Sequence, residues 1–165
     1  MMTRRSWMGM FSALGLVPAV ASSSAKDNES PLPQDKRLVR SDAEWKKQLT
    51  PAQYQVLREE GTERPFSSAL NEEKRAGRFV CAGCQHPLFT TEMKFDSGTG
   101  WPSFYTTLPE AFGTSTDHKL LFPRTEYHCA RCGGHHGHIF SDGPAPTGKR
   151  YCNNGVALAF VPAKA

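Results

Sequence analysis

Five cysteines are distributed unevenly along this chain. Cys81 and Cys84 form one C-x-x-C pair, Cys129 and Cys132 form a second, and Cys152 stands alone. Two such pairs can supply four thiolates to a single tetrahedral Zn²⁺, which leaves Cys152 without a structural partner. The spacing therefore predicts one closed structural metal site and one thiol that is free for chemistry.

The two pairs are separated by 44 residues, a longer gap than zinc ribbons usually have. A metal shared by both pairs would clamp two distant hairpins and reduce the entropy of the chain between them. We expect one structural Zn²⁺ per chain, with no coordination position left for substrate. Redox-active pairs or disulfides stay open as the alternative, because an oxidising compartment favours them.

The lone thiol of Cys152 lies between Arg150 and Asn154. On a strand, residues two positions apart share a face, so a cation, a thiol and an amide would project together. A guanidinium lowers the pKa of a thiol, and an amide can donate to a developing oxyanion. A lone cysteine is more often a small buried hydrophobe, so a reactive and a structural role both remain open here.

Three histidines, His135, His136 and His138, precede this segment among glycines. Because four sulfurs would already satisfy the zinc, we expect these imidazoles to act as proton donors or substrate contacts. A second, weak metal site is the alternative. Asp142 follows His138 by four residues across a turn, and we expect its carboxylate to orient that ring.

Two short helices should precede the residues that carry the chemistry. Ser41-x-x-Glu44 is a capping box for a helix through residue 49, and Thr50-x-x-Gln53 is a capping box for a second. Gly61 is expected to end the second helix. Apolar residues recur at helical spacing in both, which predicts that the helices pack against a sheet.

From residue 78 onward, short apolar or β-branched runs alternate with Gly, Pro, Asp and Ser. They predict strands at 79–81, 104–107, 126–129, 138–140 and 156–161. No segment alternates strands with long helices, which excludes a parallel α/β sheet. The fold predicted from this pattern is a mainly antiparallel β domain with helices at its N-terminus.

With 165 residues and 18.3 kDa, the chain supports a single ordinary domain, which we place at residues 38–163. The formal charge is +4, and no basic stripe with interleaved aromatic residues marks a nucleic-acid-binding face. We therefore expect no nucleic-acid partner, and the domain is expected to be a monomer.

The first 25 residues have the pattern of an export signal. Arg4 and Arg5 precede a mildly apolar stretch at 7–21 that is too short for a permanent membrane span. Cleavage after residue 21 or residue 25 would leave residues 26–37 as a polar, flexible linker. Residues 3–8 resemble a twin-arginine signal, which implies a periplasmic or exported protein; general secretion and an uncleaved disordered tail are the alternatives.

Four features together resemble the B-type methionine sulfoxide reductases: the two C-x-x-C pairs and the segments 96–104 (DSGTGWPSF), 134–138 (GHHGH) and 150–154 (RYCNN). The similarity extends over about residues 41–162. It implies thiol-dependent reduction of the R epimer of methionine sulfoxide, an activity that repairs proteins under oxidative stress. It also implies two antiparallel sheets in a barrel-like arrangement, with zinc at one end.

The resemblance also implies roles for individual residues. The expected set comprises the catalytic residues Cys152 (the nucleophile), His135, His138 and Asn154, the substrate-binding Trp101 and Phe140, and the flanking Arg150 and Asp142. Many members of the family carry a resolving cysteine where this chain has Thr99. We therefore expect a sulfenic acid on Cys152 to be recycled by an external thiol reductant rather than by an internal disulfide.

Two other classes of function remain open. The first is a zinc-ribbon-like binding module without catalysis, since a fold does not fix a function. The second is a thiol enzyme that acts on peroxides or disulfides. The retained thiol, imidazoles and amide favour catalysis over binding, and the Gly-Trp-Pro segment at 100–102 favours the sulfoxide as substrate.

Overall fold

The computed structural model describes residues 31–119 and 122–164. The predicted export signal and residues 26–30 of the predicted linker therefore lie outside the described residues, and both stay predictions. At the described end of the linker, Leu32 is buried and Gln34–Lys36 form a short 3-10 helix, η1. Within the described ranges, no helix has the length and apolar character needed to cross a membrane.

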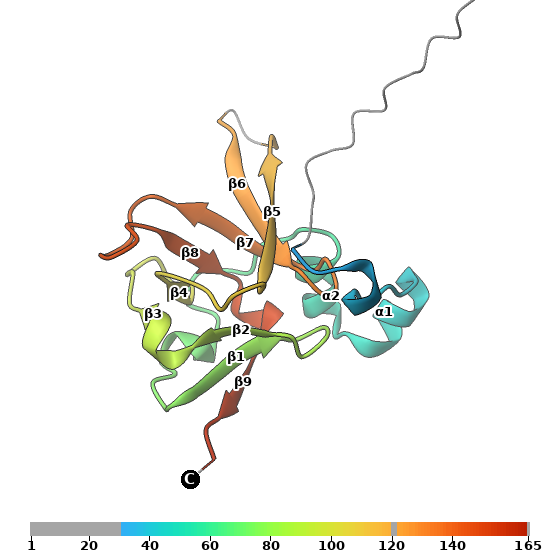
Figure 1. The fold of residues 1–165 in the computed structure, drawn as a ribbon, viewed down its shortest axis with the longest axis horizontal. Helices are drawn as coiled ribbons and strands as arrows, with labels where there is room; N and C mark the ends of the chain where they lie inside the picture. Colours follow the sequence, from blue (N-terminus) through green and yellow to red (C-terminus); the bar gives the residue numbers. More distant parts are fainter. Residues whose placement is uncertain (1–30, 120–121, 165) are drawn as a thin grey trace, which may run out of the picture.

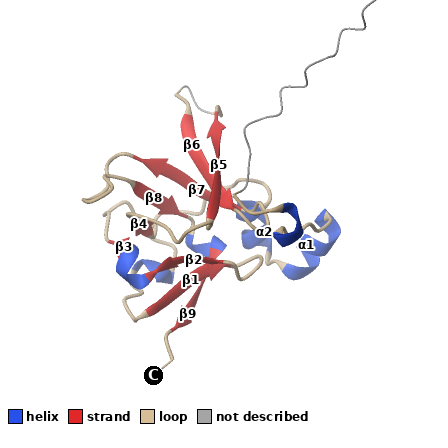
Figure 2. Cartoon of the chain, viewed as in Figure 1, coloured by secondary structure: helices blue, strands red, loops and turns tan. Residues whose placement is uncertain are grey.

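The described residues form two short α-helices followed by nine strands, with further single 3-10 turns between them (Figures 1 and 2). The elements after η1 are α1 (Asp42–Gln48), α2 (Pro51–Leu57), η2 (Ala69–Asn71), β1 (Gly77–Cys81), β2 (Pro87–Thr90), η3 (Thr91–Met93), β3 (Lys94–Phe95), β4 (Ser103–Phe104), β5 (Phe112–Asp117), β6 (Arg124–Cys129), β7 (His135–Phe140), β8 (Arg150–Asn153), η4 (Gly155–Ala157) and β9 (Leu158–Pro162).

Both predicted capping boxes are present, each with its two reciprocal hydrogen bonds. At α1, the Ser41 amide donates to the Glu44 carboxylate at 2.8 Å, and the Glu44 amide donates to the Ser41 hydroxyl at 3.4 Å. The predicted end of α2 at Gly61 is wrong, because the helix stops at Leu57. The chain turns away through Glu60, whose φ is +54°.

The strands form two antiparallel sheets, which confirms the predicted mainly β fold. One sheet has the order β2-β1-β9 and the other has the order β3-β4-β8-β7-β6-β5. Each sheet keeps two edge strands, and no pairing within the described ranges closes either sheet into a barrel. The hairpin of β5 and β6 projects from the body, and α1 and α2 lie together at one end of the molecule (Figure 1).

Several strand boundaries differ from the predicted ones. The run at 104–107 contributes only Phe104 to a strand, and the amide of the next residue, Tyr105, donates to Met93 O just before β3. The run at 156–161 begins as η4 and becomes a strand only at Leu158. Strands β2, β3 and β5 were not predicted; β5 is a polar strand with two exposed residues, so its sequence lacks a simple apolar alternation.

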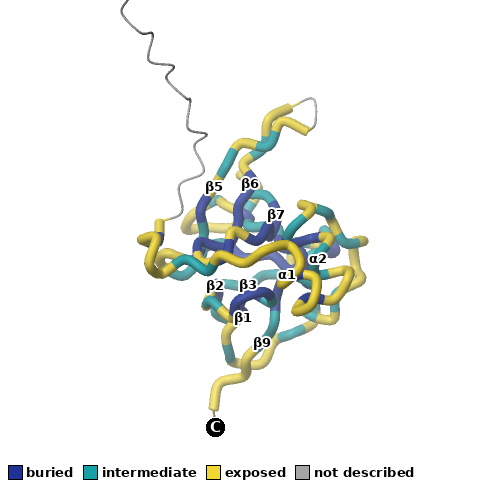
Figure 3. Tube along the Cα trace, turned by 90° about the vertical axis from the view of Figure 1, so that its right-hand side faces the viewer, coloured by how far each residue is buried: buried dark blue, intermediate teal, exposed yellow. Residues whose placement is uncertain are grey.

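Aromatic residues from both sheets form the core between them. Phe79 of β1 and Phe89 of β2 come from the small sheet, and Phe104 of β4 comes from the large one. The rings of Phe89 and Phe104 stack at 3.8 Å between centroids, and all three side chains are fully buried. Figure 3 shows the buried segments gathered where the strands of the two sheets face each other. This packed core holds the large sheet in place. The same sheet carries Cys152 on β8 and His138 on β7.

Candidate active site and metal centre

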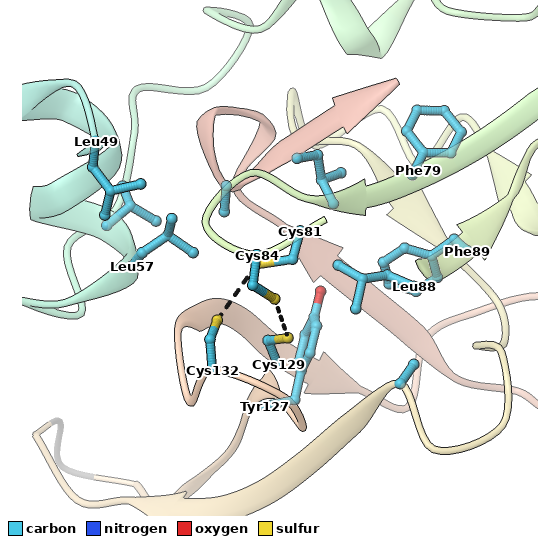
Figure 4. Packing of buried hydrophobic residues seen from close by; sticks show 14 of the residues in the cluster. Leu49, Leu57, Phe79, Cys81, Cys84, Leu88, Phe89, Tyr127, Cys129 and Cys132 are labelled. Carbon is cyan, nitrogen blue, oxygen red and sulfur yellow. Dashed lines mark hydrogen bonds between the residues drawn. The ribbon is translucent and has the colours of Figure 1, made fainter. Parts of the chain in front are cut away.

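The four paired cysteines come together at one end of the two sheets. Their sulfur atoms all lie within 4.8 Å of one another, and all four residues are buried (Figure 4). The Sγ distances are 3.7 Å from Cys81 to Cys132 and 3.6 Å from Cys84 to Cys129. Tetrahedral zinc with Zn–S bonds of about 2.3 Å requires S···S separations of about 3.8 Å. The cluster therefore has the donor set and size that a metal of this kind needs.

The two C-x-x-C turns are built alike. In the first, the Gln85 amide donates to Cys81 O at 2.8 Å, and in the second the Gly133 amide donates to Cys129 O at 2.8 Å. Gln85 has φ +61° and Gly133 has φ +68°, so each turn ends in a left-handed residue directly after its second cysteine. The same local geometry in two turns 44 residues apart brings two sulfurs from each turn to the same point.

The lone thiol of Cys152 lies in a row of polar residues across the large sheet. Ser103 of β4 is its cross-strand neighbour on one side, and His138 of β7 is its neighbour on the other. The row continues from His138 to Glu126 of β6 and from Glu126 to Ser115 of β5. Directly opposed residues in an antiparallel sheet share a face. One face of the sheet therefore carries hydroxyl, thiol, imidazole, carboxylate and hydroxyl groups in sequence.

A cavity of about 130 Å³ opens at the thiol. Its lining residues come from both sides of the row and from the loops beside it: Thr62, Trp101, Arg124, Gly137, His138, Phe140, Cys152, Asn153 and Asn154. The predicted nucleophile, one predicted histidine, the predicted amide and both predicted aromatic residues thus meet here. Three predicted residues are outside the lining: His135, Arg150 and Asp142.

A larger cavity of about 340 Å³ lies beside Cys129 and Cys132, and His135 is part of its lining. It contains neither Cys152 nor the predicted aromatic wall. The two cysteines that line it, Cys129 and Cys132, belong to the cluster of four that could hold a metal. The smaller cavity is therefore the better candidate for chemistry, because it holds the one cysteine outside the cluster.

The electrostatic surroundings of Cys152 act in opposite directions. Burial raises the pKa of its thiol, while the Arg150 guanidinium and the Thr99 hydroxyl oppose that increase. Arg150 donates two hydrogen bonds to the Asp142 carboxylate, at 2.9 and 3.0 Å, and lies 4.5 Å from the centroid of the Phe140 ring. Asp142 therefore holds the Arg150 guanidinium beside the sulfur, and the guanidinium favours the thiolate over the thiol.

The expected pairing of Asp142 with His138 is wrong. His138 Nε2 lies 2.7 Å from Asp117 Oδ2, and Arg124 Nη2 donates to the same oxygen at 2.7 Å. A hydrogen bond from the Lys119 amide is the first cause of a pKa for Asp117 far below its ordinary value, so the carboxylate is ionised. Burial lowers the pKa of His138, and Asp117 raises it. Asp117 comes from the end of unpredicted β5, 21 residues before His138.

His135 lies behind the cavity and is held by a buried carboxylate. Its Nδ1 lies 2.7 Å from Glu126 Oε1, and the other oxygen, Oε2, contacts His128 Nδ1 at 3.0 Å and accepts from the Ser115 hydroxyl at 2.6 Å. Burial raises the pKa of Glu126, but these three hydrogen bonds lower it to about 2. The His135 and His138 rings are 5.5 Å apart between centroids, and His135 is not part of the lining of the smaller cavity that contains Cys152.

Asn154 reaches the cavity from outside the strand. Strand β8 ends at Asn153, and the Asn154 amide group is fixed by two hydrogen bonds: Nδ2 donates to His136 O and Oδ1 accepts from the Glu63 amide, both at 2.9 Å. Arg150, Cys152 and Asn154 were expected on one face of one strand. This is correct for Arg150 and Cys152 and wrong for Asn154, which lies after the end of β8. Asn154 lines the cavity with an amide whose orientation is set by backbone groups.

Glu63 connects three walls of the site and was not predicted. Its carbonyl accepts from Trp101 Nε1 at 3.1 Å, and its carboxylate accepts from the amides of Gly155 and Val156 at 2.5 and 3.0 Å. Together with the bond to Asn154, these contacts tie the loop at residues 62–63 to the indole and to the chain just after Cys152. Burial raises the pKa of this carboxyl. Its partners are 38 to 93 residues away, so no local spacing identifies it.

Comparison with known proteins gives an independent result. A family model described as the SelR domain matches residues 49–162. Proteins named peptide methionine sulfoxide reductase MsrB are similar: that of Methanosarcina barkeri (strain Fusaro / DSM 804) is 52% identical over 126 residues, and that of Agrobacterium fabrum (strain C58 / ATCC 33970) is 50% identical over 129. Each match covers 76% of this chain, together with 89% and 94% of the respective relatives.

Proposed function

The chain belongs to the SelR-domain family of B-type methionine sulfoxide reductases, and from this membership we propose that it reduces the R epimer of methionine sulfoxide in proteins. The single observation that best supports this function is the position of Cys152. Its thiol lies opposite His138 in the sheet, in a cavity that also contains Trp101 and Phe140. A nucleophile, a proton carrier and an apolar wall are thus present in one small space.

The proposed first half of the cycle transfers one oxygen atom. The Cys152 thiolate attacks the sulfoxide sulfur as the oxygen is protonated, and a sulfur–sulfur bond forms. The hydroxyl group then moves to the Cys152 sulfur while the sulfur–sulfur bond and the original S–O bond break, and the products are methionine and a Cys152 sulfenic acid. Two electrons pass from the thiol to the sulfoxide. His138 carries the proton that the thiol loses and that the oxygen gains, since it faces the sulfur from the neighbouring strand. His135 lies farther back and supports this ring.

The lining of the cavity also offers a physical explanation for selection of the R epimer. Methionine sulfoxide presents an apolar methyl group, a polar oxygen and a lone pair around one sulfur atom. When the methyl group packs against Trp101 and Phe140, the R epimer directs its oxygen toward His138. The S epimer would direct the oxygen against an aromatic ring, where it loses its hydrogen bond at a cost of about 1–3 kcal/mol.

The second half of the proposed cycle uses a thiol from outside the chain. Four of the five cysteines are clustered away from Cys152, and Thr99 stands where many members of the family have a resolving cysteine. One external thiol attacks the sulfenic acid and releases water, and a second reduces the resulting mixed disulfide. The net products are the Cys152 thiol and one disulfide of the reductant.

The four clustered cysteines are proposed to bind one structural zinc. Cys81, Cys84, Cys129 and Cys132 would hold it as thiolates and leave no position for substrate. When bound, the metal supplies a crosslink between the turn after β1 and the turn after β6. Its contribution is to stability, because the cavity at Cys152 is lined by other residues.

Export is proposed from the N-terminal residues alone. Arg4 and Arg5 with the apolar stretch after them favour a twin-arginine route to the periplasm, the class of pathway that carries folded proteins. Zinc loading before transport would protect four thiols from oxidation. The proposal predicts that rerouting the domain through general secretion lowers its zinc content; unchanged zinc content would contradict it.

The function is tested by epimer-resolved reduction of a blocked methionine sulfoxide peptide with several thiol donors. Wild-type protein should reduce the R epimer, and Cys152→Ser should reduce neither epimer in a single turnover. Full activity of Cys152→Ser would exclude Cys152 as the nucleophile. Faster turnover of a peroxide than of the R-sulfoxide would favour a thiol peroxidase, and no turnover of either would favour a binding module.

A further inference from the structure

Phe66 is an exposed aromatic residue in a strained backbone position. The residue is 74% exposed, and its φ is +62°. The other non-glycine residues with a positive φ in the described ranges are all polar: Glu60, Gln85 and Glu110. Glycine and asparagine adopt this left-handed conformation readily, whereas a bulky aromatic residue is disfavoured there. A ring that buries so little of its surface does not offset this strain within the domain.

The turn that holds Phe66 does not require a ring. It is closed by a hydrogen bond from the Ser67 amide to Arg64 O at 3.4 Å. Pro65 in the second position and a left-handed Phe66 in the third make the type II pattern, whose third position favours glycine or asparagine. The amide of Phe66 donates to Gly100 O at 2.6 Å, a contact that any residue except proline can make. Neither hydrogen bond therefore explains why the side chain is aromatic.

The ring of Phe66 lies beside one wall of the smaller cavity. A Cβ on Gly100 would lie 2.8 and 2.9 Å from two ring carbons of Phe66, so the ring rests on the backbone directly before Trp101. Asn71 Nδ2 also donates to Gly100 O, at 3.0 Å, and helps to fix this backbone. The Trp101 side chain belongs to the cavity lining and donates to Glu63 O, three residues before Phe66. The ring is therefore held next to the site while its free face stays in solvent.

The size of the cavity indicates what passes over this ring. Its volume of about 130 Å³ is well below the roughly 300–1,000 Å³ of sites that enclose a whole small molecule. It can take one side chain, so the rest of a protein substrate lies outside it. Thr62 lines the cavity and is exposed, and Phe66 follows four residues later. Four residues span at most about 14 Å, which an extended substrate chain covers in about four residues.

We propose that Phe66 is a specificity-determining residue, which binds an apolar side chain of the substrate protein within about four positions of the methionine sulfoxide. The inference rests on the proposed function, because it names the sequence context that the same site prefers. An apolar side chain is favoured because the ring is uncharged, and because Arg64, the charged residue of the turn at 64–67, disfavours a cation. Binding covers the ring and removes its surface from water. The ring is already held in place, so little ordering is lost on binding.

The test compares three blocked R-sulfoxide substrates on the full-length protein, with dithiothreitol as the reductant. One is N-acetyl-methionine sulfoxide amide, and two are pentapeptides with the sulfoxide in the centre and either leucine or serine at the other four positions. Wild-type kcat/KM should be about tenfold higher for the leucine peptide than for the serine peptide. Phe66→Asn suits the turn and should abolish this preference through KM. Its kcat/KM for the amide, which does not reach the ring, should equal that of wild type.

Two further variants serve as controls. Phe66→Tyr keeps the ring and should keep the leucine preference. Phe122→Asn removes another exposed phenylalanine, which is 76% exposed, and should match wild type on all three substrates. An unchanged preference in Phe66→Asn, or an equal loss in Phe122→Asn, would overturn the role of the Phe66 ring.

Thermal unfolding separates substrate binding from a structural role of the ring. Phe66→Asn should have at least the wild-type Tm, because asparagine suits the left-handed position. A lowered Tm together with slower turnover of all three substrates would overturn the proposal. Phe66→Gly, which also suits the third position of the turn, provides a second variant without the ring and should lose the same preference.

Peptide binding separates this inference from the proposed function. The leucine peptide is labelled with a fluorophore and carries methionine in place of the sulfoxide, so its anisotropy reports binding without turnover. Wild type should bind it about tenfold more tightly than Phe66→Asn. Binding that depends on Phe66 without any sulfoxide turnover would contradict the proposed function and support the inference. Sulfoxide turnover without a leucine preference would support the proposed function and overturn the inference.

Discussion

Cys152 of β8 and His138 of β7 lie directly opposite each other in the large sheet, and the Asp117 carboxylate contacts His138 Nε2 at 2.7 Å. A thiol, an imidazole and a carboxylate are therefore aligned by strand pairing and by one long-range contact from the end of β5. The sheet fixes the first two through backbone hydrogen bonds, which hold cross-strand neighbours within about 5.5 Å. The protonation of His138 then depends on Asp117.

Replacement of Asp117 by Asn should move the pH dependence of turnover. Asp117 raises the pKa of His138 against the larger effect of burial, so its loss lowers that pKa. A proton donor works below its pKa, and activity falls as pH rises through it. The alkaline limb of kcat for Asp117→Asn should therefore shift to lower pH. Asp142→Asn, which alters Arg150 instead, should leave this limb in place; an equal shift in both variants would contradict the assignment.

Replacement of Gly100 by Ala should damage the cavity wall. Gly100 has φ +87°, and a Cβ there would lie 2.8 Å from both the ring and the amide nitrogen of Phe66. The amide of Phe66 donates to Gly100 O, so the clash would displace the loop that also holds Trp101. We expect a loss of about 2–4 kcal/mol in unfolding free energy and a raised KM.

Gly98→Ala is the matched control for that substitution. Gly98 has φ +68°, and a Cβ there would meet no atom within 4 Å. It should therefore show only the cost of a left-handed alanine, about 1 kcal/mol, with an unchanged KM. Equal effects of the two alanines on chemical denaturation and KM would mean that contact with Phe66 is unimportant.

Replacement of Glu63 by Ala should loosen the cavity without touching the nucleophile. The variant removes the carboxylate that accepts from Gly155 and Val156 and leaves those two amides without their partner. Unfolding free energy should fall by about 1–3 kcal/mol, and KM should rise more than kcat falls. Glu59→Ala, at an exposed position, is the control and should change neither. A normal KM in Glu63→Ala would show that the loop does not shape the site.

Local features of this fold were predictable because their residues are close in the chain. The capping boxes at Ser41 and Thr50 depend on a spacing of three residues, and each C-x-x-C turn closes within five residues. The cysteine pairs and the lone Cys152 were therefore found by type and spacing, whereas the aromatic wall of Trp101 and Phe140 followed from the family resemblance. Each capping box and each C-x-x-C turn is closed by hydrogen bonds between residues three or four positions apart, so the local sequence alone specifies it.

Long-range partners could not be predicted in this way. Asp117 reaches His138 through the register of β5, β6 and β7, and Glu63 reaches Val156 across 93 residues. The nearer carboxylate, Asp142, was expected to orient His138 and pairs with Arg150 instead. A carboxylate inside a strand, as at Glu126, was the one available signal, because a buried charge requires a partner.

Glu126 should make stability depend on pH in a defined window. Its pKa is lowered from 4.5 to about 2, so its ionised form stabilises the fold above pH 4.5, and this contribution is lost as pH falls toward 2. A shift of this size corresponds to about 3 kcal/mol. The difference in unfolding free energy between wild type and Glu126→Gln should therefore be largest above pH 5 and shrink between pH 4.5 and 2. A difference that stays constant with pH would mean that the charge is not the cause.

Removal of the metal should lower the thermal stability of the protein, while loss of the lone thiol should not. Cys84→Ser breaks a cluster in which every sulfur lies within 4.8 Å of the others, and it leaves three buried sulfurs without a complete shell. We expect well below one zinc per chain and a Tm lower by about 10–20 °C, with the same loss when wild type is treated with a strong chelator. Cys152→Ser is the matched control, because its side chain lines the other cavity, and it should keep one zinc and the wild-type Tm. Metal analysis and thermal unfolding of both variants decide the point: full zinc content in Cys84→Ser, or a Tm unaffected by the chelator, would show that the four sulfurs do not clamp the two turns through a metal.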